Sequence, residues 1–82
     1  MKVKQIKTIG HLRRTIASGH QDFRLYLQGG LFSRKTITLA ARGRFHIVNH
    51  IDESIQTLSE KQLSTASNVG KAIQKGSLVV LP

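Results

Sequence analysis

The chain contains no Cys and no Trp, and only one Pro occurs among its 82 residues. Without Cys, it can form neither a disulfide framework nor a thiolate metal site. No apolar run approaches the ~20 residues of a membrane-spanning helix. The basic N-terminus MKVKQIKTIG is not followed by the apolar segment of a secretory signal. We therefore expect a cytoplasmic protein without a membrane partner.

Acidic residues are also scarce, and this imbalance is the most informative property of the composition. Thirteen Lys and Arg oppose four Asp and Glu, which gives a formal net charge of +9 with neutral His. Residues 1–44 hold ten basic residues and one acidic residue, whereas residues 45–82 hold three of each. Such asymmetry favours a polyanionic partner such as DNA or RNA, although a basic protein without that partner can have the same composition.

The length is suited to one small domain, and we expect residues 1–82 to form one. Residues 2–6 alternate apolar and polar side chains, as a short edge strand does. Apolar residues at positions 9, 12 and 16 predict a helix over about residues 9–18. Thr8 is its expected N-cap, and Gly19 is suited to the left-handed conformation that ends a helix.

Three stretches alternate with the period of two that is typical of strands, namely DFRLYLQ (22–28), RKTITLA (34–40) and RFHIVNH (44–50). Gly43 is suited to a hairpin that needs a positive φ. SIQTL (54–58) is a candidate for a short fourth strand. Gly29–Gly30 is followed by a strand-like run rather than by the helix of a phosphate-binding loop, so we interpret it as a bend.

The last third of the chain carries helix signals. Ser59 and Gln62 have the spacing of a capping box, and Leu58 and Leu63 occupy the positions of a hydrophobic staple. Asn68 is the predicted cap of a second short helix, which residue 76, a Gly, would end. LVVL (78–81) either adds an edge strand or covers the core.

These elements predict an α+β fold. We expect an antiparallel β-meander of three to four strands, with one N-terminal helix and two short C-terminal helices packed on one face. The expected core residues are Ile9, Leu12, Ile16, Phe23, Leu25, Leu27, Ile37, Leu39, Phe45, Ile47, Leu63, Val69 and Ile73.

If the alternating apolar residues face the helices, the intervening side chains form a free sheet face. That face would display Arg24, Tyr26, Gln28, Thr36, Thr38, Arg44, His46, Val48 and His50, with Ser33, Arg34 and Lys35 adding to its positive rim. Cations neutralise phosphates, and Tyr or His rings stack on unpaired bases. A solvated sheet face also favours Thr, Arg and Tyr. The predicted nucleic-acid-binding residues are Arg24, Tyr26, Arg34, Lys35, Arg42, Arg44 and His46.

Two other functions remain open at this point. A small protein-interaction or homodimerising adaptor would use exposed edge strands and the LVVLP tail. An RNA-cleaving enzyme would use His46 or His20 as a general base. The predicted helix–three-strand–helix order resembles the double-stranded-RNA-binding fold and small RNA-cleaving toxins built on it. Their Gly-Ser-His-His-like stretch is absent, and SGHQD (18–22) is a poor substitute.

Metal and cofactor sites are not indicated by the sequence. His46 and His50 are four residues apart, which places them ~13 Å apart along a strand, too far to share one metal ion without a bend. The sequence therefore predicts no metal and no cofactor.

Three segments, FRLYLQGGLFSRKTI, FHIVNHIDESIQTLSEKQL and NVGKAIQKGSLV, together resemble a family of small uncharacterised bacterial proteins. That family carries related Gly-Gly, Asn-x-Ile-Asp, Thr/Ser-Glu-x-x-Leu and Asn-Ile-Gly-x-Ala-Ile blocks. The resemblance covers about residues 21–80. It implies a bacterial, cytoplasmic origin and an association with mobile DNA, and it assigns no activity and no functional residues.

Overall fold

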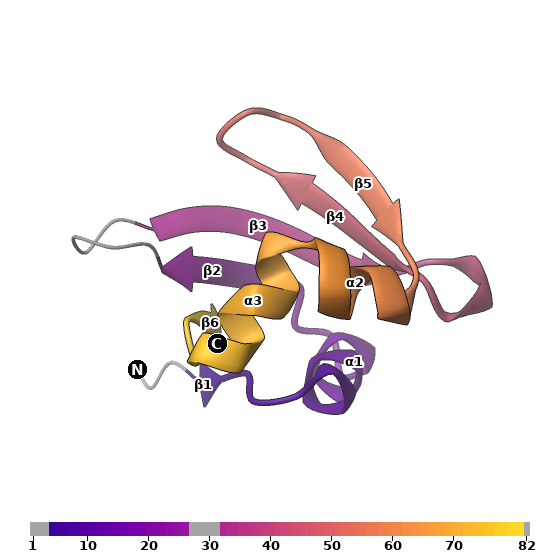
Figure 1. The fold of residues 1–82 in the computed structure, drawn as a ribbon, viewed down its shortest axis with the longest axis horizontal. Coiled ribbons are helices and arrows are strands. Elements are labelled where there is room, and N and C mark those ends of the chain that lie inside the picture. The colour runs from indigo at the N-terminus through magenta and orange to yellow at the C-terminus, as the bar shows by residue number, and fades with distance from the viewer. Residues whose placement is uncertain (1–3, 27–31, 82) are drawn as a thin grey trace.

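The computed structural model describes residues 4–26 and 32–81 (Figure 1). The predicted bend at Gly29–Gly30 and the predicted positions of Leu27 and Gln28 lie outside these residues. The elements in chain order are β1 (Lys4–Gln5), α1 (Ile9–Ala17), β2 (Asp22–Tyr26), β3 (Phe32–Leu39), β4 (Phe45–Asn49), β5 (Ile55–Leu58), α2 (Glu60–Ala66), α3 (Asn68–Lys75) and β6 (Leu78–Val80), with a 3₁₀ turn at Ala41–Gly43.

The six described strands form one antiparallel sheet in the order β1-β6-β2-β3-β4-β5. The α+β class is thus confirmed, and β2 to β5 form the predicted meander. The expected number of three to four strands was too low. β6 does not lie at an edge, because it pairs with β2 on one side and with β1 on the other.

The helix ends follow from local hydrogen bonds. The Thr8 hydroxyl accepts a hydrogen bond from the His11 N–H at 3.0 Å, and Ser59 and Gln62 form the predicted capping box. Gly76 ends α3 with a positive φ of 73°. The prediction of Asn68 as the α3 cap was wrong by one residue, because the Ser67 hydroxyl accepts the Gly70 N–H instead.

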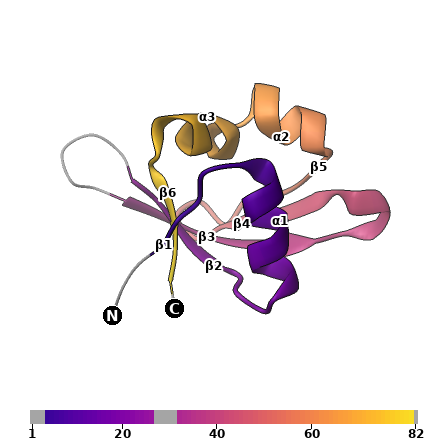
Figure 2. The same cartoon turned by 90° about the horizontal axis from the view of Figure 1, so that it is seen from below.

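The buried residues of the strands and helices form one hydrophobic cluster. α1 contacts β3, α3 contacts β2 and β6, and α2 contacts β5. Figure 2 shows α2 and α3 on the same side of the sheet. The core comprises Ile6, Leu12, Ile16, Phe23, Leu25, Ile37, Phe45, Ile47, Leu63, Val69, Ala72, Ile73, Leu78 and Val80.

Two of the expected core residues lie at its border. Leu39 is 39% exposed, because it ends β3 just before the hairpin turn. Ile9, in the first turn of α1, is only partly buried. The core extends instead to Ile6 and to the β6 residues, which become buried because β6 enters the middle of the sheet.

Candidate nucleic-acid interface

The strand register places one set of polar side chains on the sheet face opposite the core. Arg24 lies opposite Arg34, and Tyr26 lies opposite Phe32, across β2 and β3. Thr36 pairs with Val48, and Thr38 pairs with His46, across β3 and β4. We call this surface the free face and define it as Arg24, Tyr26, Phe32, Arg34, Thr36, Thr38, His46, Val48 and His50.

One end of the free face gathers two arginines and two aromatic rings, which we call the arginine–aromatic cluster (Arg24, Arg34, Tyr26 and Phe32). The Arg24 guanidinium carbon lies 4.4 Å from the centroid of the Phe32 ring. The Tyr26 and Phe32 rings are tilted against each other with centroids 6.0 Å apart. Tyr26 is 39% exposed and Phe32 is 43% exposed. The cluster therefore presents aromatic surface to solvent beside two cations.

The charges of this cluster are incompletely compensated. Like charges directly opposite each other on neighbouring strands are destabilising. Arg34 Nη2 lies 3.8 Å from Asp22 Oδ1, and because both side chains are more than half exposed, this ion pair contributes little. Arg24 Nε is buried and has no hydrogen-bond partner among the described residues. The cluster thus keeps a positive charge that an anionic partner would neutralise.

The two histidines of the free face hydrogen-bond to threonines. His50 Nε2 lies 2.6 Å from Thr36 Oγ1, and His46 Nδ1 lies 3.2 Å from Thr57 Oγ1 on β5. His20, the other residue considered for RNA cleavage, instead lines a cleft with Lys4 and His11. The structure therefore does not bring His20 and His46 into one site.

Lys35 was expected on the positive rim, and this placement was wrong. Its side chain lies on the core side of the sheet and is only 7% exposed. Ser33, two residues earlier on β3, is buried on the same side. Burial lowers the pKa of Lys35, and the nearby Asp52 carboxylate partly offsets this effect. The alternation of side chains along β3, counted back from buried Ile37, accounts for the difference.

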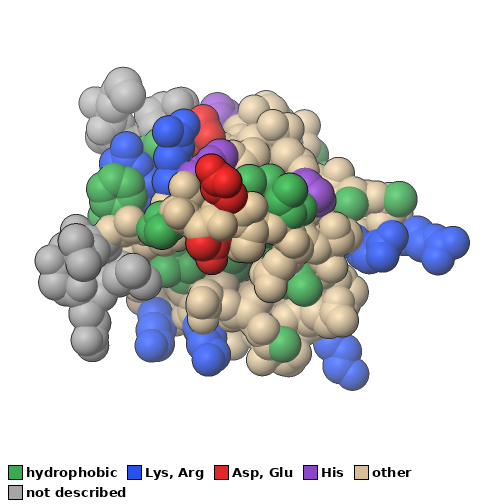
Figure 3. Space-filling model, turned by 90° about the horizontal axis from the view of Figure 1, so that it is seen from above, with side chains coloured by type: hydrophobic (Ala, Val, Ile, Leu, Met, Phe, Trp, Pro, Cys, Tyr) green, Lys and Arg blue, Asp and Glu red, His purple; other side chains and the backbone are tan. Residues whose placement is uncertain are grey.

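Arg42 and Arg44 form a second, separate basic group at the tip of the β3–β4 hairpin. Arg42 has a φ of 62° and Gly43 a φ of 71°, as the central residues of a type I′ turn require. The predicted positive φ at Gly43 is thus confirmed. Five residue steps along β3, or ~17 Å, separate Arg34 from Leu39 at the hairpin. On the face drawn in Figure 3, the visible Lys and Arg side chains lie in separate groups.

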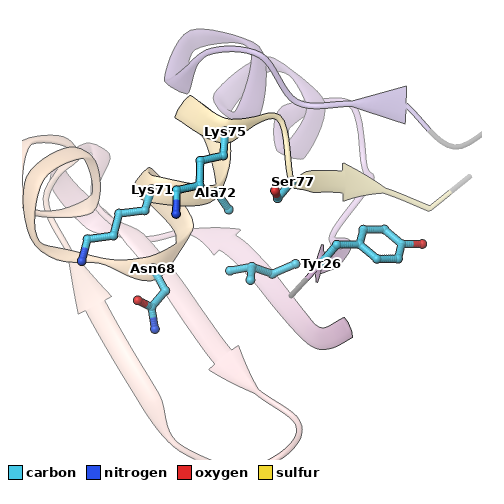
Figure 4. A pocket seen from close by; sticks show the side chains of 7 residues that line it. Tyr26, Asn68, Lys71, Ala72, Lys75 and Ser77 are labelled. Atoms are coloured by element: carbon cyan, nitrogen blue, oxygen red, sulfur yellow. The ribbon is translucent and has the colours of Figure 1, made fainter. Parts of the chain in front are cut away.

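A cleft of about 420 Å³ adjoins the arginine–aromatic cluster on the side of α3. Tyr26 and Leu25 line it from β2, and Lys71 and Lys75 line it from α3. In Figure 4 the two lysines extend from one side of α3, whereas the Tyr26 ring points away from them. Sequence reasoning missed these lysines, since they belong to the half of the chain without net charge. The spacing of four residues on one helix was the available signal.

Phe32 was also missed, because the predicted strand began at residue 34.

Within residues 4–26 and 32–81, no group of three or more His, Cys, Asp or Glu side chains is arranged to hold a metal ion. In that same part of the chain, every helix is too short or too polar to cross a membrane.

No family model, no curated protein sequence and no solved structure matches this chain. The bacterial origin and the association with mobile DNA therefore stay predictions. Any statement about function therefore rests on the geometry of the chain itself.

Proposed function

We propose that the protein is a non-enzymatic nucleic-acid-binding module, and that the free face holds a single strand of DNA or RNA. The observation that carries this proposal is the arginine–aromatic cluster, in which Arg24 and Arg34 lie opposite each other beside the exposed rings of Tyr26 and Phe32. Cations beside accessible aromatic rings are the combination that single-stranded nucleic acids require.

The arginines are suited to the phosphates. Their backbones are neighbours across two hydrogen-bonded strands, where an unneutralised pair of like charges is unfavourable. A phosphate between or beside them relieves that repulsion and releases the counterions bound to the nucleic acid. Arginine also presents a planar fork of donors that matches phosphate oxygens.

The rings are suited to the bases. Phe32 is covered on one side by the Arg24 guanidinium and still leaves 43% of the residue exposed. An unpaired base can stack on such a ring whatever its identity, because every base has a π-face. Bases inside a duplex are already stacked and cannot reach the rings, so the cluster favours single strands over duplexes.

A salt titration tests this proposal. Fluorescence anisotropy with a short single-stranded oligonucleotide should show binding at low salt that weakens steeply as salt increases. The double variant Arg24→Gln/Arg34→Gln should make the negative slope of log K against log salt shallower by about 1.4, for two lost phosphate contacts. Arg14→Gln/Lys61→Gln removes the same charge from exposed positions of α1 and α2 and should change the slope less.

The proposal fails if the wild-type protein does not bind at low salt, or if both double variants make the slope shallower by the same amount. Equal effects would mean that net charge alone attracts the polyanion and that the free face has no special part.

A homodimerising adaptor is the second candidate, and the β5 edge favours it. β5 is an outer strand of the sheet, it contains no charged residue, and Ile55 on it is 63% exposed. An uncharged exposed edge is a template for pairing with another chain. The LVVLP tail is a poorer choice for such a contact than expected, since β6 is paired on both sides. Mass in solution for the wild type and Thr57→Pro, a substitution that blocks edge pairing, tests this candidate.

A further inference from the structure

A small polar cavity of about 170 Å³ lies between the core side of the sheet and the start of α3. Lys35 lines it from β3, Asn49 and Gln56 line it from β4 and β5, and Asn68 and Val69 line it from α3. A space of this size holds more than one water molecule and therefore also admits a small polyatomic ligand. We call it the Lys35 cavity.

The cation in this cavity lacks a close partner. Lys35 is 7% exposed, and neither of the two ion pairs among the described residues includes it. Nor does any hydrogen bond from its ammonium join it to another described side chain. Burial of the side chain strips water from the charged form, which is why it lowers the pKa of Lys35, while the ammonium itself reaches the cavity without a hydrogen-bond partner among the described residues.

Asp52 also lines the cavity, yet Ser54 already satisfies its carboxylate. The pKa of Asp52 is lowered first by a hydrogen bond from the Ser54 side chain and next by the Ser54 N–H, and Lys35 contributes least among the causes. The Ser54 N–H donates to Asp52 Oδ1 at 2.9 Å. Asp52 therefore lies close enough to influence Lys35 electrostatically but does not form an ion pair with it.

The first turn of α3 lines the same cavity and contains backbone donors without partners. The Ser67 hydroxyl accepts the Gly70 N–H, and the Lys71 N–H bonds to the Ser67 carbonyl oxygen. The N–H groups of Asn68 and Val69 have no acceptor among the described residues. Donors at the start of a helix, reinforced by its dipole, attract anions.

We propose that the Lys35 cavity binds a phosphate-sized oxyanion, held by the Lys35 ammonium and by the N–H groups of Asn68 and Val69. The amide side chains of Asn49 and Gln56 face the cavity from other strands, so donors surround the space from several directions. That distribution fits a tetrahedral oxyanion better than a planar carboxylate. The site lies on the opposite side of the sheet from the free face and does not depend on the proposed function.

Phosphate of this kind has two sources, the free ion and the terminal phosphate of a nucleic acid. Titrations with inorganic phosphate, and with a dinucleotide carrying either a 5′-phosphate or a 5′-hydroxyl, distinguish them. Binding of the free ion, or of the 5′-phosphorylated dinucleotide alone, supports the site. Equal binding of the two dinucleotides, without binding of the free ion, overturns it.

The test follows backbone amide resonances while phosphate replaces chloride at constant ionic strength. We expect the Asn68 and Val69 amides to shift in a saturable manner and the melting temperature to rise. Lys35→Met keeps the unbranched stem of the side chain but removes its charged end, and it should weaken binding at least about tenfold. Asp52→Asn removes the opposing charge and should tighten binding by about threefold or more.

Two results would overturn the site. One is a phosphate effect that is unchanged in Lys35→Met, and the other is the absence of saturable shifts at Asn68 and Val69. Arg24→Gln/Arg34→Gln should keep the phosphate response in full. Loss of oligonucleotide binding in that variant, with phosphate binding retained, separates the two surfaces.

Discussion

Replacing Phe32 with Ala removes the exposed ring on which we expect an unpaired base to stack. Base–aromatic stacking contributes about 1–3 kcal/mol per base, so the dissociation constant for a single strand should rise about 5- to 150-fold. Phe32 is 43% exposed and lies outside the core cluster. Its loss should therefore lower the free energy of unfolding by only about 1 kcal/mol, mainly through the contacts with Arg24 and Tyr26.

The assay compares single-stranded and duplex oligonucleotides of one sequence at fixed low salt, with thermal unfolding as the check on folding. Ile55→Ala is the matched control, because Ile55 is exposed and pairs with Val48 on the same side of the sheet but carries no ring. Ile55→Ala should keep the affinity for single strands within about twofold of the wild-type value. The stacking interpretation is wrong if Phe32→Ala weakens the binding of single strands and of duplexes equally. It is also wrong if Ile55→Ala weakens single-strand binding as much as Phe32→Ala does.

Three further predictions concern stability. Arg42→Asn should raise the melting temperature by about 3–6 °C, because Asn tolerates the φ of 62° better than Arg; no gain relative to Arg42→Ala would contradict this. In urea unfolding, Gly70→Ala should lower the stability of the protein by about 2 kcal/mol or more, because the added Cβ would lie 2.1 Å from the Leu63 carbonyl oxygen. Gly10→Ala in α1 is the control, because its added Cβ has ordinary contacts, and it should stabilise the protein slightly. Because burial lowers the pKa of Lys35, the folded protein loses this proton before the unfolded chain does. The free energy of unfolding should therefore gain a contribution as pH rises through the folded pKa towards 10.5, and Lys35→Met should lack that gain across an alkaline urea series.

The elements that sequence predicts well are those with local causes. Thr8, the Ser59–Gln62 capping box and Gly76 act through partners within a few residues, so their spacing was enough. The meander from β2 to β5 also follows from neighbouring strands and short turns. The predicted α+β class of the whole fold was confirmed for the same reason.

The predictions that were wrong concern features that depend on contacts between segments far apart in the sequence. β6 pairs with β2 more than fifty residues earlier in the chain, and no local pattern indicates that a short apolar run lies inside a sheet rather than at its edge. Ile6 becomes fully buried only because this pairing brings β1 beside β6.

The candidate site was predictable wherever the alternation was followed strictly. Arg24, Tyr26, Arg34 and His46 lie on the expected face, because period two fixes their side. Lys35 was misplaced because its charge was allowed to outweigh its position between outward-facing neighbours. Phe32 was missed because β3 begins at Phe32, two residues before Arg34, where the predicted strand began.

The most direct test of the central claim is a residue-level map of single-strand binding by backbone amide chemical shifts at low salt. We predict that a short oligonucleotide shifts the amides of β2 and β3 around Arg24, Phe32 and Arg34, and that added salt reverses the shifts. Shifts confined to α1 and α2, or no shifts at any oligonucleotide concentration, would contradict the assignment of the free face as the binding surface.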